Sequence, residues 1–238
     1  MNNQYPIYID KYDKEKYIQE TDTHIIAKGG DGTLLKAIKM HLDKKKPFFG
    51  IGAGTVNFLM NSEHEILDNA KYKSFNLIKV RVYFTTTYAS DEIMPEMSYN
   101  EVAEFQAFND VMIGGDMNSW IDFRVREKDE LFGDFMGGGL IISTPQGSTG
   151  INKNNGGVVL PLSSGMWSIT GDKTNRKIEY VIKPRKTLIT TKSRRPVTVW
   201  VDGANHIIKN VSSVEISKGQ KVVVAFNDYS TFMKKRRV

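Results

Sequence analysis

In the first third of the chain, apolar and polar positions follow the pattern of alternating strands and helices. Short apolar runs predict strands at residues 7–9, 24–28 and 48–51. The segments between and after them are expected to be helical, at residues 13–20, 33–43 and 63–72. The middle helix is the best defined, because Leu34, Ile38 and Leu42 recur on one face. Apolar strands that alternate with helices pair in parallel, so we predict a three-layer α/β domain here.

From Phe75 onward the apolar positions alternate with polar ones, which is the pattern of half-buried strands. Such strands are predicted at residues 78–84, 121–125, 197–201, 211–216 and 221–226. Asp202-Gly203 is typical of a hairpin turn, and a second turn is expected at Lys218-Gly219. Residues 88–99 are polar and are expected to form a loop. Short strands separated by turns indicate a β-rich, sandwich-like domain.

These patterns predict an α/β plus mostly-β fold, with an N-terminal α/β domain at residues 1–85 and a C-terminal β-rich domain at residues 86–238. With 40% hydrophobic and 25% charged residues, the chain has the composition of a globular protein. It has no cysteine, which excludes disulfides, thiolate metal sites and a thiol nucleophile. No apolar run could span a bilayer and residues 1–6 lack a signal-peptide pattern, so we expect a cytoplasmic protein without membrane contact.

The net charge of +6 comes mainly from short basic runs. They lie at residues 44–46, 183–186, 192–195 and 234–237. Such runs are most often solvated surface, and they would also steer polyphosphate nucleotides toward the protein. Nucleic-acid binding is the least favoured interpretation, because no RNA-binding aromatic motif accompanies the basic residues.

The stretch Lys28-Gly29-Gly30-Asp31-Gly32-Thr33 joins a predicted strand to a predicted helix. A glycine turn in this position directs backbone N–H groups and a helix N-terminus toward an anion, most often a phosphate. Asp31 is a carboxylate in the middle of this turn, where a negative charge is useful if it binds a metal or accepts a proton. Taken alone, Asp31 is better explained as the N-cap of the following helix.

Two further motifs follow in order along the chain, Asn109-Asp110 and residues 143–149 (Ser-Thr-Pro-Gln-Gly-Ser-Thr). Together with the glycine turn, they resemble the NAD kinase family. The resemblance covers residues from about 24 to about 237, and it implies a two-domain fold like the one predicted above. It further implies transfer of the terminal phosphoryl group of ATP to the 2′-hydroxyl of the adenosine ribose of NAD. A divalent metal such as Mg²⁺ and a homo-oligomer, a dimer or a tetramer, are implied as well.

By this resemblance, Asp31 is the catalytic residue and a possible metal ligand. The glycine turn would bind phosphates through Gly29, Gly30, Gly32 and Thr33. The residues expected to bind NAD are Phe58, Asn109, Asp110, Gly138, Gln146, Thr149, Gly150, Ile151 and Asn154.

The chain departs from the family pattern at several of these positions. Asp110 replaces a glutamate, Gly138 replaces an aspartate of a Gly-Asp-Gly motif, and Ile151 replaces an aromatic residue. The aspartate at position 110 keeps the chemistry of the glutamate with a shorter reach. The changes at Gly138 and Ile151 imply weaker recognition of the nicotinamide half of NAD, or a different acceptor. Two alternatives therefore stay open, a nucleotide-binding homologue with little or no catalysis and a lipid kinase. The lipid kinase is suggested by the second glycine loop, residues 52–58.

Overall fold

The structure is a computed structural model that describes residues 18–52, 58–62, 70–85, 99–115, 119–127, 130–191, 197–203 and 206–236. The chain divides into two compact units. One, here called the β-rich unit, is formed by Leu77–Gln220. The other, the N-terminal unit, combines the described residues up to Asn76 with those from Lys221 onward. The expected domain split at residue 85 stays a prediction, and the two units differ from it in assigning Lys221 onward to the N-terminal unit.

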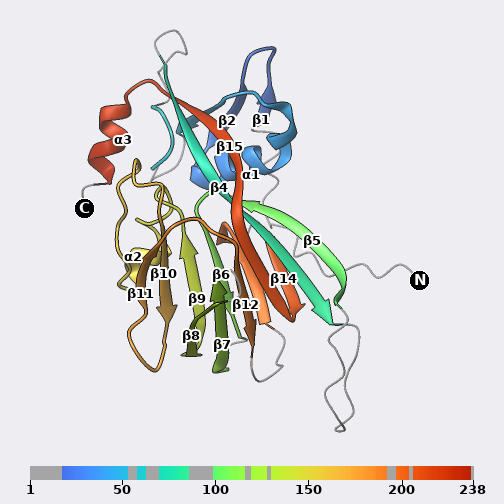
Figure 1. Cartoon of the computed structure of the whole chain (residues 1–238). Helices are drawn as coiled ribbons and strands as arrows, with labels where there is room; N and C mark the ends of the chain where they lie inside the picture. Colours follow the sequence, from blue (N-terminus) through green and yellow to red (C-terminus); the bar gives the residue numbers. More distant parts are fainter. Residues whose placement is uncertain are drawn as a thin grey trace, which may run out of the picture. The chain divides into compact units, whose positions relative to one another are not determined.

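Parallel strands form the centre of the N-terminal unit. Its elements are β1 (Ile18–Glu20), β2 (Ile25–Gly29), α1 (Asp31–His41), the 3-10 turn η2 (Leu42–Lys44), β3 (Phe48–Gly52), the end of β15 (Ser213–Phe226) and α3 (Tyr229–Lys235). Strand β3 pairs in parallel with both β2 and β15. Figure 1 labels β1, β2, α1 and β15. The predicted parallel pairing is confirmed, whereas the three-layer arrangement stays a prediction.

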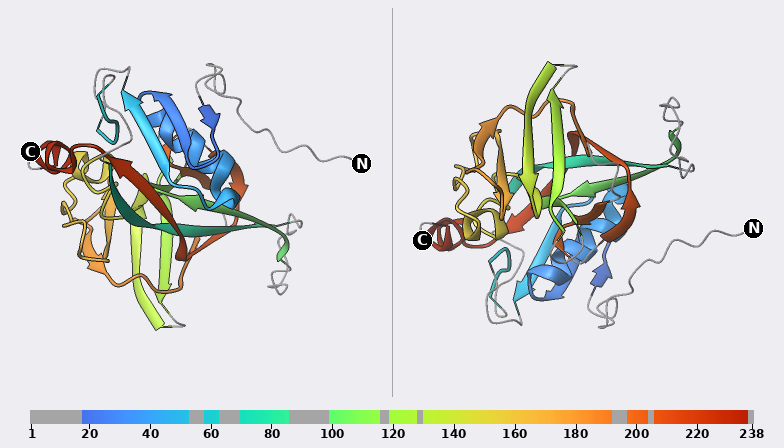
Figure 2. Two further views of the ribbon diagram at one scale, coloured as in Figure 1. Left: turned by 90° about the horizontal axis from the view of Figure 1, so that it is seen from above. Right: turned by 90° about the horizontal axis from the view of Figure 1, so that it is seen from below.

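Helix α1 packs against β2 and β3, as both views of Figure 2 show. The apolar face that its spacing predicts is buried, with Leu34 at 0% and Ile38 at 4% exposure. Burying each such aliphatic side chain contributes about 1.5–3 kcal/mol. Leu42, the third residue of that face in the sequence, lies in η2 after the helix has ended.

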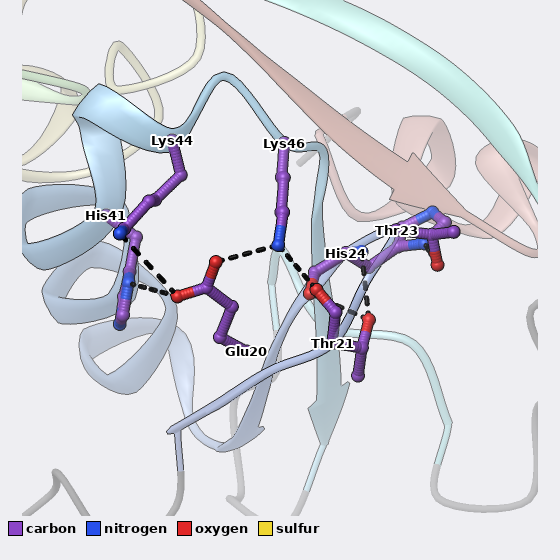
Figure 3. A network of polar contacts seen from close by, with 7 residues as sticks. All are labelled: Glu20, Thr21, Thr23, His24, His41, Lys44 and Lys46. Carbon is purple, nitrogen blue, oxygen red and sulfur yellow. Dashed lines mark hydrogen bonds and ion pairs between the residues drawn. The ribbon is translucent and has the colours of Figure 1, made fainter.

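The helix expected at residues 13–20 is wrong at its end, because Ile18–Glu20 is a strand that pairs antiparallel with β2. Glu20 there accepts a 2.7 Å hydrogen bond from Lys46 Nζ, which also donates to the Thr21 carbonyl (Figure 3). The bond to Lys46 lowers the pKa of the Glu20 carboxyl. Pairing with β2 provides hydrogen bonds for the backbone of this polar segment, whereas a short isolated helix would be unstable. The predicted strand at 7–9 and residues 13–17 lie outside the described residues.

The buried Asn61 side chain joins two of the parallel strands. Its amide donates to the carbonyls of Gly50 in β3, at 2.9 Å, and of Ala225 in β15, at 3.1 Å. Its oxygen accepts from the Asn227 N–H at 2.9 Å.

The helix expected at residues 63–72 is wrong at its end, because Lys71 and Tyr72 begin strand β4 (Lys71–Thr85). Residues 63–69 lie outside the described residues.

The β-rich unit consists of strands from two sheets. The first holds β4, β5 (Tyr99–Ala107), β7 (Ile121–Glu127), β8 (Glu130–Gly137), β12 (Thr187–Thr191) and the start of β15. The second, in spatial order, holds β11 (Glu179–Ile182), β10 (Trp167–Asp172), β9 (Gly139–Ser143), β6 (Asp110–Gly114), β13 (Val197–Val201) and β14 (His206–Val211). Apolar residues of both sheets, such as Val80, Val125, Ile142 and Val199, form one buried core. The predicted β-rich character is confirmed.

The turn expected at Lys218-Gly219 is wrong, because β15 runs without interruption from Ser213 to Phe226. A Cβ atom at Gly219 would lie 2.9 Å from both Leu77 O and Lys79 N. The glycine therefore permits the close approach of neighbouring β4 and does not mark a turn. The loop expected at residues 88–99 is wrong at Tyr99, which begins β5, while residues 86–98 lie outside the described residues.

The predicted hairpin at Asp202-Gly203 is confirmed, since β13 and β14 pair antiparallel across it. Asp202 has φ +50° and Gly203 has φ +66°, the left-handed conformation that such turns require. Among the described residues, no helix combines the length and the apolar character needed to cross a membrane.

Candidate functional site

The glycine turn connects β2 to α1 as the sequence predicts. Gly29 has φ +154°, and a Cβ atom there would lie 3.1 Å from the Thr33 Cβ, so this position requires glycine. Gly30 is the N-cap residue of α1, and no described side chain caps this end of the helix. The Thr33 N–H donates to Gly30 O at 2.9 Å, whereas no described residue accepts from the N–H groups of Asp31 and Gly32. These two N–H groups can therefore bind an anion such as a phosphate.

The Asp31 carboxylate binds backbone N–H groups of another segment. Its Oδ2 accepts from the Phe58 N–H at 2.9 Å, and its Oδ1 accepts from the Leu59 N–H at 2.6 Å. The N-cap interpretation of Asp31 is wrong, because Asp31 is the first residue of α1 and Gly30 precedes it as the cap. A carboxylate has about four acceptor positions, and the described residues use two of them, which leaves two for a hydroxyl or a metal ion.

The Phe58 ring is held by aromatic residues near the end of the chain. It lies edge-on to Phe232 of α3, with ring centroids 5.9 Å apart, and Phe232 stacks on Phe226 at 4.8 Å. Phe232 is 3% exposed. The C-terminal helix thus packs against the segment whose amides bind Asp31. The expected contact between Phe58 and NAD stays a prediction.

A second cluster, in the β-rich unit, surrounds the Phe108–Asp110 turn between β5 and β6. Asp202, at the β13–β14 hairpin, accepts from three successive backbone N–H groups of this turn: Phe108 at 2.8 Å, Asn109 at 2.6 Å and Asp110 at 3.2 Å. Sequence reasoning missed this role, because the Asp-Gly pair is fully accounted for by a hairpin. No local signal in the sequence points to the distant turn.

Residues 143–149, here called the Ser/Thr loop, bind the carbonyl groups of the same turn. Thr144 Oγ1 lies 2.8 Å from Phe108 O and 3.0 Å from Asn109 O, and the Thr144 N–H donates to Asn109 O at 2.9 Å. Gln146 is 4% exposed, and its amide donates to Phe108 O at 2.7 Å. The structure therefore brings Asn109, Asp110 and Gln146 together. The contact expected between Gln146 and a base stays a prediction.

Gly147 packs directly on this turn, where a Cβ atom would lie 2.6 Å from Asn109 Cα. We expect Gly147→Ala to displace the Asn109 backbone and to lower the free energy of unfolding by about 1–3 kcal/mol, as for other overpacked positions. Chemical denaturation measures this loss. Gly150→Ala is the matched control for stability, because its added methyl group would meet its nearest neighbour, Gly147 O, at an ordinary 3.4 Å. Equal losses in the two variants would contradict the prediction.

The end of the loop leads into the short helix α2 (Ile151–Asn154). Thr149 and Ile151 are half-buried, and Gly150 and Asn154 are exposed, so these predicted NAD-binding residues lie at the surface of the unit. Asn152, which was not predicted, is fully buried: its amide donates to Ser148 O and Val158 O, and its oxygen accepts from Thr170 Oγ1. Through these hydrogen bonds the buried Asn152 side chain anchors the end of the Ser/Thr loop, a role that no sequence pattern indicates.

Two carboxylates with raised pKa values meet at the Phe108–Asp110 turn, that of Asp110 and that of Asp202 from the hairpin. Loss of hydration raises the pKa of Asp110 to about 7, and the negative charge of Asp202 contributes to this. Loss of hydration also raises the pKa of Asp202 to about 6, against the opposing effect of the three backbone N–H groups. Among the described residues, none donates a hydrogen bond to the Asp110 carboxylate. This carboxylate can therefore accept hydrogen bonds from the hydroxyls of a ligand.

Comparison with known proteins adds to this geometry. No family model matches the sequence. A NAD kinase from Xylella fastidiosa is 30% identical over 219 residues, which span 88% of this chain and 80% of that protein. The chain belongs to the NAD kinase family. The resemblance seen in the motifs is thereby confirmed.

Solved NAD kinase family structures share the fold. The NAD kinase from Archaeoglobus fulgidus, in complex with ATP, matches with a TM-score of 0.70 at 21% identity, over 90% of this chain and 82% of that one. The yeast NADH kinase complexed with NADH matches with a TM-score of 0.76 at 17% identity, over 90% of this chain and 64% of that one.

Gly138, a departure from the NAD kinase family pattern, lies apart from the other NAD-binding candidates. Asp110 pairs with Ser143 at one end of β9, whereas Gly138 directly precedes the other end, where Gly139 pairs with Gly114. A Cβ atom at Gly138 would lie 3.3 Å from Asp172 Oδ2. A carboxylate introduced at position 138 would therefore meet the carboxylate of Asp172.

Few residues could bind a metal in this member of the NAD kinase family. Within the described ranges, no group of three or more His, Cys, Asp and Glu side chains could hold a metal ion. Asp31 offers one carboxylate within the glycine turn. Magnesium is often bound by one or two carboxylates together with substrate phosphates and water. A single carboxylate therefore fits a metal ion that is bound mainly by the phosphates of a nucleoside triphosphate.

Proposed function

We propose that this chain transfers the terminal phosphoryl group of ATP to the 2′-hydroxyl of the adenosine ribose of NAD, giving NADP. The observation that carries the proposal is the Asp31 carboxylate at the uncapped start of α1, in a chain of the NAD kinase family. Retention of this carboxylate favours an enzyme over a nucleotide-binding homologue, because a negative charge opposes the binding of phosphate alone. A lipid kinase is not favoured, because its motif explains neither Asn109-Asp110 nor the Ser/Thr loop.

In the proposed reaction, the NAD 2′-oxygen forms a bond to the γ-phosphorus of ATP, and the bond from that phosphorus to the β–γ bridging oxygen breaks. ADP leaves with the electron pair of that bond. Asp31 accepts the hydroxyl proton at one of its free acceptor positions and later releases it to water. Gly29, Gly30, Gly32 and Thr33 place backbone and hydroxyl donors around the phosphates. Phosphoryl transfer depends mainly on such positioning and charge neutralisation.

NAD recognition is assigned mainly to the β-rich unit. The unpaired Asp110 carboxylate accepts hydrogen bonds from ribose hydroxyls, and the Asn109 amide pairs with a base edge. The remaining contacts with NAD are assigned to Phe58, Gly138, Gln146, Thr149, Gly150, Ile151 and Asn154. Aspartate at position 110 is one methylene shorter than the glutamate of the family pattern, so NAD must approach this carboxylate more closely.

Magnesium, or another divalent ion, would be held by Asp31 and the ATP phosphates, and it would neutralise phosphate charge when bound. We also propose that the chain forms a homo-oligomer, a dimer or a tetramer, and works in the cytoplasm. The absence of cysteine from the sequence is compatible with a reducing compartment.

The proposal is tested by incubating the purified chain with NAD, ATP and Mg²⁺ and detecting NADP with an NADP-specific dehydrogenase. We expect NADP to accumulate in proportion to the amount of protein, and none to form when ATP is omitted. Binding of ATP by calorimetry without any NADP formation would overturn the proposal and favour a nucleotide-binding protein.

A further inference from the structure

We infer that Asp202 is a positioning residue for NAD, which fixes the backbone of the Phe108–Asp110 turn so that Asn109 and Asp110 meet the nucleotide. The inference rests on the proposed function, in which these two side chains bind NAD. Asp202 itself is not placed in contact with NAD. Its effect passes through the turn that its carboxylate holds.

The hydrogen bonds of the turn separate into two sets. All three N–H groups, those of Phe108, Asn109 and Asp110, donate to the Asp202 carboxylate. In return, the Asp202 N–H donates to Asp110 O at 3.0 Å. The carbonyls of Phe108 and Asn109 accept from the Ser/Thr loop, through Thr144 and Gln146. Asp202 thus accepts from every N–H group of the turn, and the Ser/Thr loop donates to its carbonyls.

This geometry requires an aspartate. A carboxylate accepts on both oxygens, and Asp202 uses Oδ2 for Phe108 and Oδ1 for the other two amides. An asparagine could serve the Oδ1 pair, but its NH₂ group would face the Phe108 N–H, donor against donor. Loss of the acceptor would leave buried N–H groups unsatisfied, which favours a different conformation of the turn. Asn109 and Asp110 would then no longer lie where NAD meets them.

The left-handed conformation of Asp202 supports the same conclusion. A non-glycine residue at φ +50° is uncommon, and here Asp202 is followed by Gly203 at φ +66°. The hairpin alone would accept asparagine or glycine at this position equally well. A role confined to the hairpin therefore predicts that Asp202→Asn is neutral, whereas a positioning role predicts a specific loss of NAD binding.

The test compares the full-length Asp202→Asn and Asp202→Ala variants with the wild type in the NADP-forming assay. We expect the KM for NAD to rise about 3- to 10-fold in Asp202→Asn, which keeps one acceptor, and at least about 30-fold in Asp202→Ala. The KM for ATP is expected to stay within about twofold, and kcat to fall less than the KM for NAD rises. An unchanged KM for NAD in folded Asp202→Asn overturns the inference, as does a parallel rise in both KM values.

Glu215→Gln is the matched control. Glu215 is another buried carboxylate of the β-rich unit, bound by Lys186 Nζ at 2.8 Å and not by the turn. We expect this variant to lose stability without a change in the KM for NAD. A rise in the KM for NAD equal to that of Asp202→Asn would show a general effect of destabilisation and overturn the inference.

The two hypotheses fail in different ways. If the wild type makes NADP and the KM for NAD of Asp202→Asn is unchanged, the proposed function is supported and the positioning role of Asp202 is excluded. If the wild type makes no NADP, the function fails, and the same variants are compared by calorimetry for NAD affinity. Equal dissociation constants of wild type and Asp202→Asn in that measurement also overturn the positioning role.

Discussion

Asp31→Asn is expected to reduce kcat for NADP formation by about 10²- to 10⁴-fold, the range that a positioned general base contributes. The variant keeps the size of the side chain and removes its ability to accept a proton. One amide oxygen can still accept from Phe58 or Leu59, which lie at 2.9 and 2.6 Å in the wild type. The segment after the second glycine loop should therefore remain attached to α1, and the loss should appear in the chemical step.

Steady-state kinetics with the dehydrogenase-coupled assay measure this effect, and calorimetry with ATP verifies that the nucleotide still binds. Asp43→Asn provides the control, since Asp43 lies in η2 of the same unit and outside the glycine turn. Its kcat should stay within about twofold of the wild type, as for an exposed substitution away from the site. An Asp31→Asn enzyme with a kcat near that of the wild type would exclude Asp31 as the base.

Asp110→Asn is expected to stabilise the fold and to weaken NAD binding. The pKa of Asp110 is about 7 in the folded chain against an ordinary 3.8, so folding favours its protonated form. The resulting stabilisation is complete below about pH 4 and is lost as the pH rises through about 7. The variant should therefore melt at a higher temperature than the wild type at pH 8 and at the same temperature at pH 4.

The same substitution removes the charged acceptor for ribose hydroxyls, which should raise the KM for NAD about 10- to 100-fold. In the wild type, the KM for NAD should rise as the pH falls below about 7, because protonation removes that acceptor, and the variant should lack this dependence. Melting curves at both pH values and a pH profile of the KM measure the two effects. Reduced stability of the variant at pH 8 would contradict the prediction.

The elements that could be predicted are those whose signal is local. Strand β2, the glycine turn and α1 follow one another in sequence, and their apolar spacing defines them. The uninterrupted β15 could not be predicted, because Lys218-Gly219 has the composition of a turn and only the approach of β4 explains the glycine. Propensity is outweighed here by pairing with a strand that is distant in sequence.

The site follows the same rule. The order of its motifs was enough to predict Asp31, Asn109 and Asp110 as candidate site residues, and their roles stay predictions. Long-range hydrogen bonds could not be predicted from the sequence, and they change the interpretation of two residues. Asp202 accepts from a turn about ninety residues earlier. The Gln146 amide donates to the Phe108 carbonyl. A pattern along one chain identifies residue types at a spacing, whereas these roles depend on which segments meet in the fold.

The boundary between the two units falls inside β4 and β15, which has a consequence for synthesis on the ribosome. The N-terminal unit is not a continuous segment, because β3 pairs with Val224 and Ala225. While residues beyond Lys221 are still untranslated, β3 is an open parallel edge, and Phe58 lacks the Phe232 ring. An open edge favours association with other chains. We therefore expect the surroundings of Asp31 to fold only after the residues from Lys221 onward have left the ribosome. The β-rich unit, which ends at Gln220, is synthesised before them and can fold earlier.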